Sequence, residues 1–221
     1  MAISGDVAPG TGGATFSVGC HGGLIFDEPM VNEKGDVAFH ACFTGGFGVF
    51  LKRDNKPLSL IARTGDFVRG VGILSADEAD FDGPKINDKG TVLFVVRNIT
   101  AGTTTAAVFQ KKIGKPLKAI LKQGDPAPGT NGGVFDDFDD MDQNNLDDAA
   151  IIAQYTEDGG ATFKAGVFLI QNNGIVVRII RDGNTLPGTN GGKLDGSLCV
   201  PGRCPMEAID GPWLNVRRNS A

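Results

Sequence analysis

Short apolar segments alternate with turns that contain glycine, asparagine or proline along the whole chain. Residues 36–43 (DVAFHACF), 48–53 (GVFLKR) and 57–63 (PLSLIAR) each have the length of a single strand. Residues 87–90 (NDKG) are typical of a tight turn, because Asn and Asp side chains bond the nearby backbone and Gly accepts a positive φ. The pattern predicts antiparallel strands joined by short turns, with little helix.

These segments recur at a period of about 59 residues. The pair Val49-Phe50 returns as Val108-Phe109 and again as Val167-Phe168. The loop APGTNGG at residues 127–133 returns as LPGTNGG at residues 186–192 and, one residue shorter, as APGTGG at residues 8–13. We therefore expect one repeat domain over residues 1–221, which consists of repeat 1 (residues 5–64), repeat 2 (residues 65–123), repeat 3 (residues 124–182) and a partial repeat 4 (residues 183–216).

Two copies depart from the pattern. The loop of repeat 2 has changed to FVRGVGI, and the Asn-Asp-x-Gly turn is lost from repeat 3. There the spacing aligns residues 141–152 (MDQNNLDDAAII) with residues 81–94 (FDGPKINDKGTVLF). In this alignment an Asp recurs at one position of the repeat, as Asp27, Asp82, Asp142 and Asp210. Such an Asp is typical of a turn that its side chain holds in place.

One repeat offers about four strands, and a single sheet of this size cannot bury both of its faces. Neighbouring repeats must therefore stack on one another to form a continuous core. We predict an all-β fold of tandem four-stranded antiparallel repeats that is β-propeller-like, with a β-solenoid as the alternative.

The repeat motif, which reads GDxAPGTGGxF, then FxxPxINDxGxVAF, then GVF and LxxIARxGD, resembles one in a known group of proteins. It is similar to the repeats of long secreted bacterial proteins of unassigned function, which often carry cell-surface anchoring signals. The resemblance covers nearly the whole chain and implies an extracellular or cell-surface protein. It implies no catalytic residues.

Charge and hydropathy exclude two classes of partner. The formal charge of −5 and the pI near 5.0 leave no basic surface for nucleic acid. No segment approaches the roughly 18 apolar residues that a membrane-spanning helix needs. The first ten residues (MAISGDVAPG) lack the regions of a signal peptide, which leaves open whether a leader was removed or the segment was excised.

The four cysteines lie near the two ends of the repeat array. In an oxidising compartment we expect local disulfides, Cys20 with Cys42 and Cys199 with Cys204. A zinc site would need four convergent ligands, which this spacing and two histidines do not favour.

The run DDFDDMDQNNLDD in repeat 3 is the best candidate for a metal site, because calcium prefers several carboxylate oxygens in one loop. The candidate ligands are Asp137, Asp139, Asp140 and Asp142. An EF-hand is excluded, since Asn145 stands where glycine is required and Ile151 where the bidentate Glu is required. A solvated sheet edge explains the same residues without calcium, and we expect no other cofactor.

No motif for nucleophilic, metal-dependent or phosphate chemistry is present, and we expect no enzymatic activity. A Cys-His nucleophile pair could be built from Cys20, Cys42, His21 and His40, but a disulfide would consume both thiols. His40 alternates with Phe39 and Ala41 along a predicted strand, where a hydrogen-bonded and partly exposed histidine is expected.

The partial fourth repeat suggests how the protein works. If the front segment of each repeat completes the preceding sheet, then residues 5–32 form a strand without a partner, and a free edge remains at the other end. We therefore predict a non-enzymatic extracellular structural protein that self-assembles into a ring or filament by strand pairing between subunits. The predicted assembly residues are Phe16, Phe26, Leu194, Ile209 and Trp213. The alternative is a monomeric or dimeric binding module for glycans, which would stack sugars on Phe163, Tyr155, Trp213 or Phe47.

Overall fold

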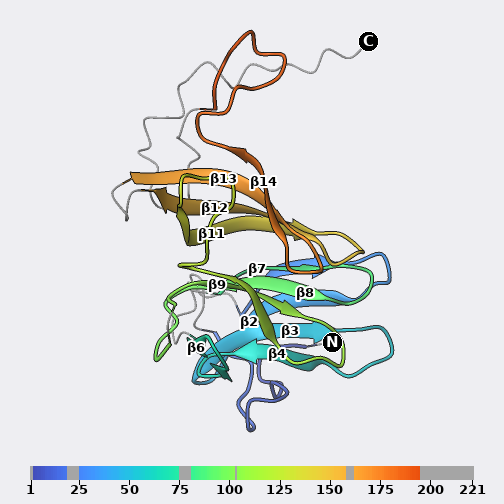
Figure 1. Ribbon diagram of the computed structural model, residues 1–221. Coiled ribbons are helices and arrows are strands. Elements are labelled where there is room, and N and C mark those ends of the chain that lie inside the picture. The colour runs from blue at the N-terminus through green and yellow to red at the C-terminus, as the bar shows by residue number, and fades with distance from the viewer. Residues whose placement is uncertain (1, 19–24, 75–80, 103, 158–161, 195–221) are drawn as a thin grey trace, which may run out of the picture. The chain divides into compact units, whose positions relative to one another are not determined.

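The computed structural model describes residues 2–18, 25–74, 81–102, 104–157 and 162–194 (Figure 1). The chain divides into two compact units, Met1–Arg181 and Asp182–Ala221. Among the described residues every regular element is a β-strand, so the predicted all-β class is confirmed.

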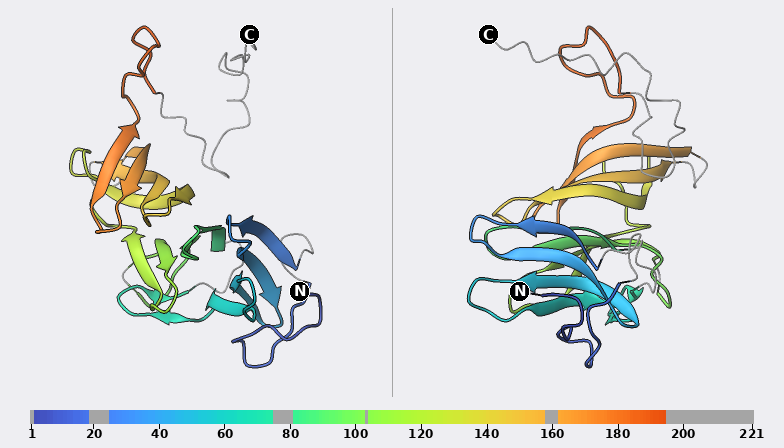
Figure 2. Two further views of the ribbon diagram at one scale, coloured as in Figure 1. Left: turned by 90° about the vertical axis from the view of Figure 1, so that its right-hand side faces the viewer. Right: turned by 180° about the vertical axis from the view of Figure 1, so that it is seen from behind.

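Three four-stranded antiparallel sheets make up most of the first unit, and each is a simple meander in chain order (Figures 1 and 2). The first sheet consists of β1 (Phe26–Val31), β2 (Val37–Phe43), β3 (Gly46–Lys52) and β4 (Ser59–Arg63). The second consists of β7 (Phe81–Ile86), β8 (Val92–Val96), β9 (Ala107–Lys111) and β10 (Lys118–Lys122). The third consists of β11 (Val134–Gln143), β12 (Ala149–Glu157), β13 (Thr162–Ile170) and β14 (Val176–Arg181). The small hairpin of β5 (Phe67–Val68) and β6 (Gly72–Ile73) precedes the second sheet.

A closed loop stands at the start of every repeat. In the first, the Gly5 amide donates to the Phe16 carbonyl at 2.9 Å, and the Phe16 amide donates to Asp6. The same closure joins Gly65 to Leu74, Gly124 to Phe135 and, within the second unit, Gly183 to Leu194. The first glycine of each loop has a φ between 80° and 88°, which explains why glycine recurs there. The loop of repeat 2 is therefore changed in sequence but closes in the same way.

Consecutive sheets share hydrophobic cores. One core joins the first and second sheets, and its members include Ala38, Val49, Val92 and Phe94. A second core joins the second and third sheets through Leu93, Val95, Ile151 and Phe168 among others. Alternate residues of β8 thus face opposite neighbours, as the pleat of a strand requires. Each sheet has a leading face, toward its own loop, and a trailing face, toward the next sheet.

The turn of repeat 3 is present, although the sequence alignment treated it as lost. In the first two sheets the amides of Gly35 and Gly90 donate to Asn32 and Asn87, and in the third the Asp147 amide donates to Asn144 at 3.1 Å. Asp147 has a φ of 68°, close to the 75° of Gly90. Asp tolerates this left-handed conformation better than most residues, so an aspartate has replaced the turn glycine.

The position assigned to the recurring Asp in repeat 3 was wrong. Phe26 pairs with Ala41, Phe81 with Val96 and Phe138 with Ala153, each next to a β-bulge. The residue after Phe138 is Asp139, which therefore matches Asp27 and Asp82, and Asp142 does not. The cause is a shorter spacing, since Asn87 and Asn144 are 57 residues apart.

The free strand was predicted on the condition that the front segment of each repeat completes the preceding sheet, and this condition is not met. β1 pairs with β2 of its own repeat. The third sheet has all four strands by Arg181. The front segment of a repeat therefore does not supply the missing strand of the repeat before it.

Candidate functional site

The trailing face of the third sheet is apolar. Along β12 and β13 its apolar side chains alternate with residues that belong to the second core, and they are Ile152, Val167 and Leu169. On β14 it continues with Val177, Ile180 and the bulge residue Ile179. Of these, Val177 is 39% exposed and Ile179 is 59% exposed. Exposed aliphatic side chains gathered on one sheet face are typical of an interaction surface.

Equivalent positions in the other two sheets are covered. Val49 and Val108, which match Val167, are buried in the first and second cores. Ala62 and Leu121, which match Ile180, are buried as well. Ile61 and Ile120, which match Ile179, pack against the cores beside the following sheets. The trailing face of the third sheet thus has the composition of a buried face.

The leading face of the first sheet is the counterpart at the other end of the array. It holds a groove of about 640 Å³ lined by apolar side chains that include Phe26, Val37, Phe39 and Leu58. The matching Phe81 and Phe94 of the second sheet lie in the core between the first and second sheets. In the first sheet this position is covered only in part, by the loop that carries Ala8 and Phe16. The groove therefore lies where a preceding sheet would pack.

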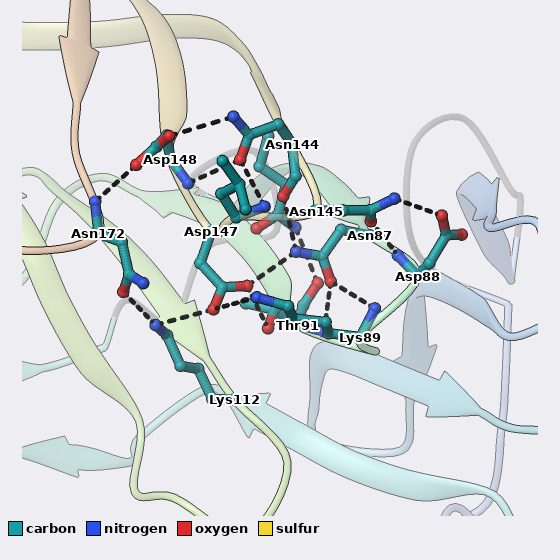
Figure 3. A network of polar contacts seen from close by, with 12 residues as sticks. Asn87, Asp88, Lys89, Thr91, Lys112, Asn144, Asn145, Asp147, Asp148 and Asn172 are labelled. Atoms are coloured by element: carbon teal, nitrogen blue, oxygen red, sulfur yellow. Dashed lines mark hydrogen bonds and ion pairs between the residues drawn. The ribbon is translucent and has the colours of Figure 1, made fainter.

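Asparagine turns join the sheets along one side through a polar ladder, and Figure 3 shows the junction between the second and third sheets. The Asn32 amide Nδ2 donates to the Asn87 carbonyl at 2.9 Å, and the Asn87 Nδ2 donates to the Asn144 carbonyl at 2.9 Å. One residue further on, the Glu33 amide donates to Asp88 Oδ1 at 2.9 Å, and the Asp88 amide donates to Asn145 Oδ1 at 2.8 Å. The same two rungs thus occur at both junctions and align consecutive sheets.

The Asp147 carboxylate completes the second junction. Its Oδ1 accepts from Asn87 Nδ2 at 2.8 Å and from Thr91 Oγ1 at 2.9 Å, and its Oδ2 lies 3.0 Å from Lys112 Nζ (Figure 3). Burial raises the pKa of Asp147, but the hydrogen bonds from Asn87, Lys112 and Thr91 and the charge of Lys112 outweigh it, so the pKa lies below its ordinary value. Asp147 is therefore a buried, ionised carboxylate that links two repeats.

The sequence comparison did not identify Asp147, because it aligned the repeats on Asp27, Asp82 and Asp142. The pattern Asn-x-x-Gly at residues 32–35 and 87–90 and Asn-x-x-Asp at residues 144–147 would have identified it. Aligning on the asparagine places Asp147 at the turn glycine.

The predicted assembly residues fall in different places. Phe16 is 1% exposed and Phe26 is half-buried, and their rings lie 5.3 Å apart beside the groove. Leu194 closes the loop of the second unit. Ile209 and Trp213 lie outside the described residues.

The four candidate calcium ligands have other partners or positions. Asp137 pairs with Arg97 at 2.9 Å, and Asp140 with Lys85 at 3.4 Å. The Oδ1 atoms of Asp137, Asp140 and Asp142 each accept from the next backbone amide. Asp139 lies between the two residues at which the β11 register shifts. Within the part of the chain that the structure describes, no three His, Cys, Asp or Glu side chains converge on a metal position, so we do not propose calcium binding.

Several other candidate residues are buried. His40 is 2% exposed, which corrects the partly exposed position that we expected, and its ring contacts Phe47 and Phe81. Tyr155 and Phe47 lie in cores, so neither can stack on a sugar, whereas Phe163 is 51% exposed. Cys42 has no free thiol. Its expected partner Cys20, like Cys199 and Cys204, lies outside the described residues, and the two pairings stay predictions.

The fold and the two terminal faces define this chain as an all-β repeat protein. It belongs to a protein family of unknown function, DUF7453, whose family model matches residues 1–200. Neither the curated proteins nor the solved structures include a match to the chain. A search of the described residues finds no helix long and apolar enough to cross a membrane.

Proposed function

We propose that this chain is a non-enzymatic extracellular structural protein that self-assembles head to tail into a ring or a filament. The proposal depends mainly on one observation, the 59% exposure of Ile179 on the trailing face of the third sheet. Its equivalents Ile61 and Ile120 pack beside a following sheet. The proposed occupant of that face is the leading face of the first sheet of a second copy.

Two junctions within the chain are the templates for this contact. In both, the trailing face of one sheet meets the leading face of the next in a continuous apolar core. A second copy offers the same kind of leading face, with Phe39 in the position of Phe94 and Phe26 in the position of Phe81. Because the two surfaces differ, the contact is heterologous and gives a ring if the rotation closes and a filament if it does not.

The contacts between repeats favour stacking of faces over the strand pairing that the sequence suggested. Each of the three sheets is complete with four strands from its own repeat. Consecutive sheets meet through side chains, and a fully buried large aliphatic side chain contributes roughly 1.5–3 kcal/mol. We therefore propose stacking as the subunit contact, and strand pairing is the mode that it would replace.

An extracellular location is part of the proposal. It is supported by the resemblance to secreted repeat proteins and by Cys42, which has no free thiol. Disulfides form and persist in oxidising compartments. We propose Cys20 as the partner of Cys42, so that the bond would fasten the end of β2 to the segment before β1.

The test is the size of the purified chain over a range of concentrations, measured by light scattering and viewed by negative-stain electron microscopy. We expect ordered rings or filaments for the wild type. Ile179→Asp should prevent assembly and leave the monomer folded, because this side chain is already exposed. Phe67→Asp is the matched control, since Phe67 is 68% exposed but lies on the hairpin before the second sheet. A wild type that stays monomeric at every concentration would contradict the proposal.

That monomeric outcome would favour the alternative, an extracellular glycan-binding module. The observation on its side is Phe163, whose exposed ring at the start of β13 could stack on a sugar. Binding to a glycan array that is lost in Phe163→Ala would support it.

A further inference from the structure

We infer that the ladder of asparagine turns continues across the interface between subunits and sets their register, with Asn144 and Asn145 of one copy donating to Asn32 and Glu33 of the next. This inference rests on the proposed head-to-tail assembly. It assigns a positioning role to these four polar residues. They are not part of the apolar faces, so their role can be tested separately from stacking.

The ladder has a direction. At each junction the asparagine side chain of the earlier turn donates to the backbone of the later turn: Asn32 donates to Asn87, and Asn87 to Asn144. In the neighbouring rung the backbone amides donate the same way, from Glu33 to Asp88 and from Asp88 to Asn145. The Asn145 side-chain amide also donates back to Asp88 Oδ2. The third turn therefore presents donors at one end of the array, and the first turn presents acceptors at the other end.

The donor end is exposed. Asn144 and Asn145 are exposed, whereas Asn87 is 4% exposed in the middle of the ladder. The Asn144 side chain is already oriented, because its Oδ1 accepts from the Leu146 and Asp148 amides at 2.8 and 3.0 Å. Its Nδ2 lies 3.2 Å from Asp148 Oδ2. Asn32 Nδ2 makes the matching contact to Asp36 and still reaches the next turn, so Asn144 can do the same.

At the acceptor end, Glu33 is the residue that can test the contact between subunits separately from the internal ladder. By equivalence with Asp88 and Asn145, the Glu33 side chain should accept from the Asn145 amide of the preceding copy. Glu33 is exposed, and within its own chain its backbone amide makes the junction contact. Replacing its side chain should therefore leave the internal ladder intact. A carboxylate that accepts from an amide gives one of the stronger hydrogen bonds.

The Glu33 series tests this role in the full chain. We would measure the concentration of half-maximal assembly by light scattering and the thermal midpoint of the subunit below that concentration. Glu33→Ala should raise the concentration for assembly roughly tenfold and leave the thermal midpoint unchanged. Glu33→Asp should restore assembly or strengthen it, because Asp88 shows that the shorter carboxylate fits this rung.

Two results would overturn the inference, and only the second would also contradict the proposed head-to-tail assembly. If the wild type assembles and the Ala and Asp variants assemble as it does, the ladder does not extend between subunits, while head-to-tail stacking stands. If the wild type remains monomeric, both the ladder and the proposed function fail. The behaviour of the wild type separates these cases, and Ile179→Asp, which acts on the apolar contact, tests whether the assembly depends on stacking.

Discussion

Asn87 donates its side-chain amide to the carboxylate of Asp147 at 2.8 Å, so the turn of the second sheet is tied to the turn of the third by a buried hydrogen bond. Asp147 also occupies the place of a turn glycine in the other two repeats, at a φ of 68°. One residue therefore combines a backbone conformation that favours glycine with a charge that links two repeats.

Substitutions of Asp147 should separate these two roles. Asp147→Ala removes the carboxylate that accepts from Asn87, Thr91 and Lys112 and keeps an unfavourable φ. We therefore expect a loss of roughly 2–4 kcal/mol in the free energy of unfolding. Asp147→Gly relieves the backbone and should lose roughly 1 kcal/mol less. Urea denaturation would measure both. Equal losses would mean that the backbone conformation costs nothing here.

The stability of the fold should depend on pH through the same carboxylate. Hydrogen bonds and Lys112 outweigh burial and hold the pKa of Asp147 below its ordinary value of 3.8. Its contribution is then fully present above that ordinary value and is lost as the pH falls through the lower, folded-state pKa. We expect the thermal midpoint to fall below about pH 4 and to fall less steeply in Asp147→Asn. A variant with the same pH profile as the wild type would exclude Asp147 as the cause.

The closing residue of the third loop should be essential to the core. Phe135 is 1% exposed, and its ring lies 4.8 Å from that of Phe168. Phe135→Ala should lower the free energy of unfolding by roughly 3–5 kcal/mol. The control is Phe163→Ala, which should change it by roughly 0.5 kcal/mol or less, because that ring is 51% exposed. Denaturation curves for the two variants provide the comparison.

The proposed Cys20 to Cys42 disulfide can be checked by peptide mapping under non-reducing conditions. We expect one cross-linked peptide that contains both residues, and reduction should destabilise the fold by roughly 3 kcal/mol for a loop of this size. Cys42→Ser should lower the thermal midpoint to that of the reduced wild type. A peptide that joins Cys42 to Cys199 or Cys204 would overturn the local pairing.

Local pattern alone determined the class of fold. The apolar segments of strand length, the turns and the recurrence of Val49-Phe50 at a period of about 59 residues were sufficient to predict four-stranded antiparallel repeats. They were sufficient because a strand's pleat and a turn's φ depend on the few residues that form them. The stacking of repeats followed from the inability of one small sheet to bury both faces.

Only the tertiary structure decided which polar residues matter and which faces are open. The turn pattern of the sequence can place Asp147 at a turn, but it does not show the role of this residue, which depends on contacts with Asn87 and Lys112 from another repeat. Val49 and Val167 are the same residue at equivalent positions of two repeats, yet Val49 is buried and Val167 is only half-buried. The difference arises because burial of a sheet face is set by what packs on it, and no local pattern records that neighbour.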